Sequence, residues 1–225
     1  MDEGDGGPSK ETTPAAAKLW HKIRRQRCQR MAVLGGLIHR LGRDPTSKRR
    51  PGLLWIGSPC SPWRFYTRIH TRRSAEKPEG NEDATYCESH NILAEHLAIA
   101  CKKAKRGGTR WAWETTSNGG TDLWKYQPVK NMLQVSKAGG VITHACAFME
   151  RTKATGKIYS IKSSDKEALQ TLRRPCIFPP GELHPVQLMC NTPNGKVKGD
   201  IRAMKESSEY TCQFASAVVD AYFPS

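Results

Sequence analysis

Residues 53–63 read LLWIGSPCSPW, and the interpretation of the whole chain starts from this stretch. Its first five residues form a short apolar run bounded by Pro-Gly and Ser-Pro, which predicts a buried strand. The run leads directly into Cys60, which Pro59 and Pro62 hold in a stiff turn. A cysteine at the end of a strand is either a small packing residue or a nucleophile.

The sequence beyond this stretch alternates between expected helices and strands. Glycine pairs stop the expected helices over 84–105 and 124–137, and strands are expected over 109–114 and 141–148. A further strand over 157–163 follows a turn too short for a crossover helix, so it should pair antiparallel with the preceding strand.

The remainder is expected to hold a short helix over 165–173, an irregular stretch over 174–206 and a final helix from Ser207 or Ser208 to about Tyr222. Alternating units of this kind predict an α/β fold with helices on both faces of the sheet. We expect a partial Rossmann-like, mostly parallel sheet to which the closing hairpin adds an antiparallel terminal strand.

Composition points to a polyanionic partner. The 225 residues carry 36 Lys+Arg against 21 Asp+Glu, for a net charge of +15, and the hydrophobic content of 37 % suits one medium domain. Such a surplus favours nucleic acid, either DNA or RNA, as the partner, with an anionic membrane as the second interpretation.

The sequence shows neither a transmembrane segment nor a secretory signal. No run approaches the roughly 18 apolar residues of a transmembrane segment, and the acidic, Gly/Pro-rich start does not read as a secretory signal. The eight cysteines are irregularly spaced and read as reduced thiols, so we expect an intracellular protein, nuclear or cytoplasmic.

Charge divides the chain into three parts. Residues 1–17 read as a disordered tail, 18–50 as a basic helical arm and 51–225 as the α/β domain. The arm holds eleven Lys and Arg and one acid, a net charge of 11 − 1 = +10. It is either a solvated amphipathic helix or a nucleic-acid-contacting arm, whose candidate contacts are Arg24, Arg25 and Arg27.

Ligands of such sheets bind beyond the carboxyl ends of the strands, where Cys60 and Glu114 are expected, with His144 and Cys146 near the end of the third strand. Arg64 and Arg68 follow Cys60 and would favour its thiolate. Glu114 is either an acid whose pKa burial raises or a cap for the loop after it. A thiol hydrolase pairing Cys60 with His144 or His96 is a further, weaker possibility.

Metal sites were sought by spacing. The candidate groupings are Cys87 with His90, His96 with Cys101, His144 with Cys146, and Cys176 with His184 and Cys190. None has a recognised paired-knuckle spacing, so no metal is expected.

Two motifs give the chain a resemblance to a known family. LLWIGSPCSPW resembles the Pro-Cys nucleophile loop of DNA cytosine-5 methyltransferases, and RWAWETT, which ends the next strand, resembles their Glu-Asn-Val motif. The pieces ACAFMERTKATGKIYSIKSS, LRRPCIFPPGELHP and EYTCQFASAVVDAY look like a divergent branch from transposable-element polyproteins and some viral proteins. The resemblance covers roughly 51–222 and implies a class I methyltransferase-like fold.

The resemblance also implies a mechanism. A flipped cytosine would enter the pocket, the Cys60 thiolate would add to ring carbon 6, and Glu114 would hold the ring nitrogen and the exocyclic amine. Carbon 5 would then take a methyl group from S-adenosylmethionine. Arg173 and Arg174 would contact phosphates, or else form a solvated helix end.

The family's Phe-x-Gly-x-Gly cofactor loop has no counterpart here, and Thr115-Thr116 replaces the Asn-Val of the motif. We therefore expect a nucleic-acid-associated partial domain that is degenerate or takes its S-adenosylmethionine site from a partner chain. The alternative is a non-enzymatic basic module that binds an acidic protein or a membrane surface.

Overall fold

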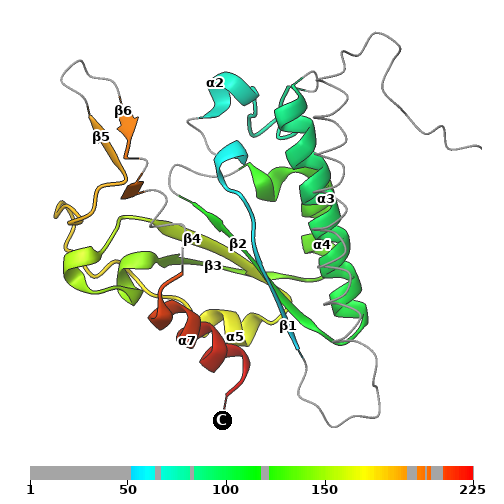
Figure 1. Ribbon diagram of the computed structural model, residues 1–225. Coiled ribbons are helices and arrows are strands. Elements are labelled where there is room, and N and C mark those ends of the chain that lie inside the picture. Colours follow the sequence, from blue (N-terminus) through cyan, green and yellow to red (C-terminus); the bar gives the residue numbers. More distant parts are fainter. Residues whose placement is uncertain are drawn as a thin grey trace, which may run out of the picture.

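Four strands form the central sheet of the protein. They are β1 (Leu53–Gly57), β2 (Arg110–Thr116), β3 (Gly139–His144) and β4 (Ile158–Ser163), in the order β1-β2-β4-β3. The computed structural model describes residues 52–63, 67–81, 84–117, 122–191, 197–200, 202–203 and 210–224. The expected α/β class is confirmed (Figure 1).

Strand pairing confirms one expectation and corrects another. The strands β1 and β2 are parallel neighbours, with Gly57 opposite Glu114, and β3 and β4 form the expected antiparallel hairpin. The expectation of a mostly parallel sheet with the hairpin strand at its end is wrong. Strand β4 lies between β2 and β3 and pairs antiparallel with both, so the sheet has one parallel pair. The crossover from β2 to β3 leaves a gap one strand wide, which the returning hairpin strand fills.

Helices cover both faces of this sheet. The helices α3 (Thr85–Arg106) and α4 (Gln127–Val135) pack together on one face, whereas α5 (Lys166–Thr171) and α7 (Cys212–Tyr222) lie on the other (Figure 1). Short 3₁₀ turns join them: η1 (Ser61–Trp63), η3 (Leu123–Lys125), η4 (Ala145–Phe148) and η5 (Arg151–Lys153). We name the two faces the α3 face and the α7 face.

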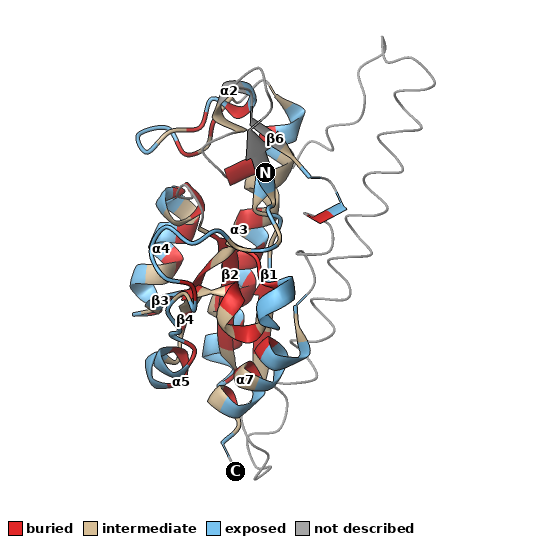
Figure 2. Ribbon diagram, turned by 90° about the vertical axis from the view of Figure 1, so that its left-hand side faces the viewer, coloured by how far each residue is buried: buried red, intermediate tan, exposed pale blue. Residues whose placement is uncertain are grey.

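Side-chain alternation along β2 divides the core into two layers. Trp111 and Trp113 are fully buried on the α3 face, together with Leu97 and Met132. Ala112, one residue out of phase, belongs to the layer under α5 and α7. Figure 2 shows the buried residues gathered along the strands and on the helix sides that meet them. Because β2 is buried on both faces, polar and apolar residues do not alternate regularly along it.

A buried arginine fixes the loop that precedes α3. The Arg73 side chain is 2 % exposed, and its guanidinium stacks 3.7 Å from the Trp63 ring centroid. It donates hydrogen bonds to Asn91 Oδ1 at 2.8 Å, to the Cys87 carbonyl at 3.3 Å and to the Pro78 carbonyl. These bonds replace the water that burial removes and attach the loop, with α2 (Arg68–Thr71), to α3.

The last third of the chain departs from expectation in two places. The stretch expected to be irregular contains a small hairpin of β5 (Met189–Asn191) and β6 (Val197–Gly199). The final helix begins after Thr211, not after Ser207 or Ser208, because the Thr211 hydroxyl accepts the N-terminal hydrogen bond from the Phe214 amide at 3.1 Å. Asp165 caps α5 in the same way.

The tail over 1–17, the basic arm over 18–50 and its candidate contacts Arg24, Arg25 and Arg27 lie outside the described residues, as does Arg64. No helix in the described ranges has both the length and the apolar character needed to cross a membrane.

Two residues of α4 provide a test of the packing. Met132 is fully buried in the α3-face core, whereas Val135 on the same helix is 73 % exposed. We expect Met132→Ala to lower the free energy of unfolding by about 2–5 kcal/mol, because it leaves a cavity between helix and sheet. Urea denaturation followed by circular dichroism measures the change.

Val135→Ala is the matched control, and its effect should stay within about 0.5 kcal/mol. Equal effects of the two substitutions would show that α4 does not pack on the sheet through Met132.

Candidate functional site

The turn after β1 carries Cys60 at the carboxyl end of this strand, as expected. Cys60 is partly exposed and free of a disulfide. Its neighbours pack toward the α3 face: Ser58 Oγ accepts a hydrogen bond from Trp113 Nε1 at 2.9 Å, and the Trp63 ring lies 5.4 Å from that of Tyr126. Among the described residues, no hydrogen bond links the Cys60 thiol to a histidine, so the thiol-hydrolase interpretation has no structural support.

Glu114 lies on the neighbouring strand but on the other face. It is 5 % exposed and sits in phase with Ala112, in the layer that faces α7. Parallel pairing therefore brings the cysteine turn and the carboxylate strand to adjacent positions, with the flanks of the turn packed on the α3 face and the carboxyl group on the α7 face. No hydrogen bond joins Cys60 and Glu114 within the described part of the chain.

Aromatic side chains surround the Glu114 carboxyl group. The Tyr210 hydroxyl donates a hydrogen bond of 2.6 Å to Oε2, and the Tyr210 ring packs edge-on against Trp55 and Tyr159. Oε1 is buried and has no hydrogen-bond partner among the described residues. A buried carboxyl oxygen without a hydrogen-bond partner disfavours the charged form of the group.

Burial raises the pKa of Glu114, while the Tyr210 hydrogen bond and the Lys157 charge act in the opposite direction. Gly57, opposite Glu114, makes room for Tyr210: a Cβ atom at this glycine would lie 2.6 Å from the Tyr210 hydroxyl. The sequence predicted that burial could raise the pKa of this glutamate, but it gave no sign of Tyr210, which is 96 positions away.

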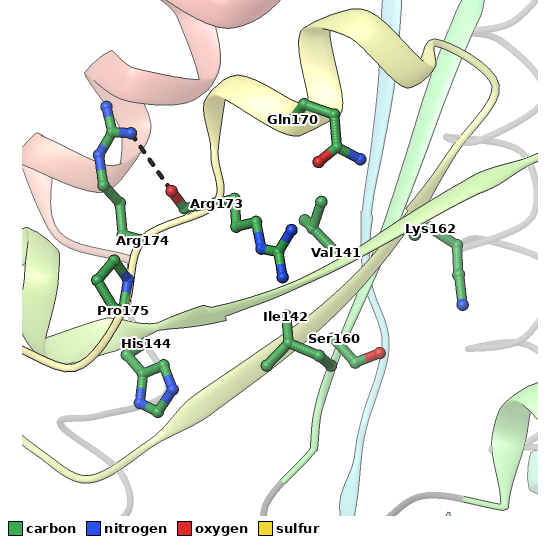
Figure 3. Close-up of a pocket in the computed structure, with 10 residues that line it drawn as sticks. Val141, Ile142, His144, Ser160, Lys162, Gln170, Arg173, Arg174 and Pro175 are labelled. Carbon is green, nitrogen blue, oxygen red and sulfur yellow. Dashed lines mark hydrogen bonds between the residues drawn. The ribbon is translucent and has the colours of Figure 1, made fainter.

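A cationic hollow lies along the edge strand β3. It has a volume of about 740 Å³ and is lined by Gly140, Val141, Ile142, His144, Ser160, Lys162, Gln170, Arg173, Arg174 and Pro175. Figure 3 shows the Arg173 guanidinium reaching toward β3, whereas the Arg174 guanidinium turns back toward the Arg173 carbonyl, 3.4 Å away. The lining contains three cationic side chains and no acidic one.

The arginines predicted to contact nucleic acid thus have different settings. Arg173 and Arg174 are exposed and line this hollow. Arg68 instead forms a two-pronged ion pair with the buried Asp122, with N–O distances of 2.7 and 3.0 Å. Because the pair holds α2 to the segment before η3, Arg68 has a structural role already.

A cluster of sulfur and imidazole groups lies at the end of β3. Side-chain ligand atoms of His144, Cys146 and Cys176 all lie within 4.8 Å of one another, and Cys176 Sγ lies 3.3 Å from His184 Nε2. Sequence spacing placed His144 with Cys146 in one grouping and Cys176 with His184 and Cys190 in another, and so led to the expectation of no metal. The fold brings members of the two groupings together, which spacing alone could not show.

Glu114 allows a test of its burial by pH. Because its pKa is raised, the folded chain keeps the proton at pH values where the unfolded chain has lost it. The free energy of unfolding should therefore fall as pH rises from the ordinary glutamate range through the raised folded pKa. Glu114→Gln removes this loss, so urea denaturation should show the variant gaining stability relative to wild type as pH rises.

Glu167→Gln, at an exposed position of α5, is the control, and its difference from wild type should vary less with pH. Tyr210→Phe removes the bond that lowers the pKa of Glu114 and should move the transition to higher pH. A pH-independent effect of Glu114→Gln would contradict the buried setting.

No protein-family model matches the chain, and no significant match was found to a curated protein or to a solved structure. The function has to be inferred from the residues of the chain itself.

Proposed function

We propose that this protein is a nucleic-acid-binding module built on a partial cytosine-5 methyltransferase-like domain, and that it does not transfer methyl groups by itself. The observation that carries the proposal is the cationic hollow beside β3, which gathers Lys162, Arg173 and Arg174 without an acidic neighbour in its lining. Clusters of this kind bind phosphates, since phosphate contacts require dense positive charge more than a special shape.

The composition of the hollow suits a nucleic-acid strand. Ile142, 48 % exposed, provides an apolar surface between the cations, and Ser160 and Gln170 add hydrogen-bonding groups. Bases can rest on apolar side chains while phosphates meet the guanidinium groups. The net charge of +15 would attract either DNA or RNA over a longer range.

The methyltransferase-like part of the proposal is supported by β1 and β2. The Pro-Cys turn and the glutamate strand are parallel neighbours, as the resemblance implies. The strand inserted antiparallel between β2 and β3 is compatible with a class I methyltransferase-like sheet.

Two features argue against methyl transfer by the chain alone. The flanks of the Cys60 turn pack on the α3 face, whereas Glu114 faces α7, and Tyr210 already occupies one oxygen of Glu114. In addition, the printed sequence has no counterpart of the Gly-rich loop that the resemblance assigns to S-adenosylmethionine. In an active assembly, a partner chain would supply the site for the methyl donor.

Binding is tested by fluorescence anisotropy with labelled single-stranded and duplex DNA and RNA of one sequence over a range of salt. We expect the logarithm of the affinity to fall linearly with that of the salt concentration. The double variant Arg173→Ala/Arg174→Ala should bind roughly 10-fold more weakly and lower the salt slope by about 1 to 2.

The matched control is Lys103→Ala/Arg106→Ala, which removes the same charge from exposed positions on α3. It should weaken binding clearly less. Absence of wild-type binding at low salt, or equal losses in the two double variants, would contradict the proposed site. Capture by acidic proteins or anionic vesicles that survives nuclease, without nucleic-acid binding, would favour the alternative of a basic interaction module.

Catalysis is tested with a DNA oligonucleotide carrying 5-fluorocytosine in the presence of S-adenosylmethionine. We expect binding without a covalent adduct, because the flanks of the Cys60 turn and the Glu114 carboxyl group lie on opposite faces of the sheet. Denaturing gel electrophoresis separates the adduct from free protein. An adduct that forms with wild type and disappears in Cys60→Ser would show that this chain is an active nucleophile and overturn the non-catalytic part of the proposal.

A further inference from the structure

The four side chains at the end of β3 have the composition of a metal site. Two cysteines and two histidines come from three places in the chain: His144 ends β3, Cys146 lies in η4, and Cys176 and His184 belong to the segment after α5. Two thiolates with two imidazoles form one of the common ligand sets of structural zinc.

The distances place His144, Cys146 and Cys176 within reach of one ion, with His184 beside Cys176. Zinc bonds of about 2.3 Å to sulfur and 2.0–2.1 Å to nitrogen imply separations of roughly 3.8 Å between two sulfurs and 3.5 Å between sulfur and nitrogen. The sulfurs of Cys146 and Cys176 are 3.6 Å apart, and Cys176 Sγ lies 3.3 Å from His184 Nε2. A ring nitrogen of His144 lies within 4.8 Å of the sulfur atoms of both cysteines.

A backbone hydrogen bond supports one of the two sulfurs. The Phe178 amide donates to Cys176 Sγ at 3.5 Å. Amide donors to sulfur stabilise thiolates, and such outer contacts orient the ligands of a metal. The Phe178 ring packs 4.5 Å from the His184 ring and shields that side of the cluster.

The backbone around each ligand is held independently of any metal. The Arg174 carbonyl accepts a hydrogen bond from the His144 amide at 3.1 Å, which places Cys176 beside the end of β3. The Val186 amide donates to the Ala154 carbonyl at 3.2 Å, which holds the segment that carries His184. At Gly156, a Cβ atom would lie 3.3 Å from His184 Nδ1, so this glycine allows the imidazole its close position.

We propose that His144, Cys146, Cys176 and His184 bind one Zn²⁺ ion, which fastens the segment after α5 to the end of β3. The segment from Arg173 to Leu188 contains no helix or strand, and irregular segments of this length are uncommon in compact domains and are usually functional or disordered. Binding releases the two thiol protons to solvent. The site rests on contacts at the end of β3 and does not depend on the proposed nucleic-acid binding.

The test measures metal on the full-length chain purified without chelators. We expect about one zinc per chain by mass spectrometry of the metal after gel filtration. Titration with Co²⁺ should give the intense visible bands of a tetrahedral site with thiolate ligands. Cys176→Ser should lose the bands and lower the zinc content at least about 10-fold, since ligand loss costs more than the loss of an outer contact.

Matched controls use groups outside the cluster. Cys212→Ser changes an exposed thiol of α7, and it should keep the full zinc content. If Cys176→Ser does not fold by circular dichroism, His184→Ala tests the same site by competition with a chromophoric chelator, with exposed His96→Ala as its control. His184→Ala should bind zinc at least about 10-fold more weakly than wild type.

Three results would overturn the proposal. The first is wild-type protein that binds no zinc, and the second is equal zinc content in the wild type and the cluster variants. The third is cysteines that react with maleimide after reduction but do not react after removal of metal by a chelator. The last result would show a Cys146–Cys176 disulfide in place of a metal site. Maleimide reactivity that appears on chelation alone supports zinc.

Discussion

Strand β4 forms hydrogen bonds with β2 on one side and β3 on the other, and the rest of the structure depends on this double pairing. Its alternating side chains send Tyr159 and Ile161 into the core under α5 and α7, while Ser160 and Lys162 face the other way. The Ser160 hydroxyl accepts a hydrogen bond of 2.9 Å from the Trp124 indole, which belongs to η3 on the α3 face. Beyond it, Lys162 and β3 border the cationic hollow.

Side-chain alternation along β2 turns Glu114 toward α7, away from the core contacts that flank the Cys60 turn. Parallel register places Gly57 opposite Glu114, and a position in phase with Ala112 must share its face. The turn after Gly57 bends toward the α3 face because Ser58 bonds to the Trp113 indole and Trp63 joins the core there. Proximity in the sheet therefore does not by itself create a common pocket, and the binding surface that we propose is the hollow beside β3.

The hollow and the sulfur-imidazole cluster share one structural cause. The chain after α5 returns along the end of β3, where the Arg174 backbone bonds to Thr143 and His144. This return brings Arg173 and Arg174 to the hollow and Cys176 to the cluster. A metal at the cluster would fix the path of the segment that presents the two arginines, and so would make their positions a property of the fold.

The elements that depend on local patterns could be predicted from the order of residues alone. Apolar runs and glycine stops gave the four core strands, α3 and α4, and the short turn after β3 gave the antiparallel hairpin. The positive charge and the placement of Cys60 beside the Glu114 strand also followed from sequence. Three further features depend on tertiary packing: β4 enters the middle of the sheet, Tyr210 bonds to Glu114, and histidine and cysteine residues from two separate groupings meet. These features join residues tens of positions apart, and contacts at that separation are selected by which surfaces the whole chain can bury together, which no local pattern records.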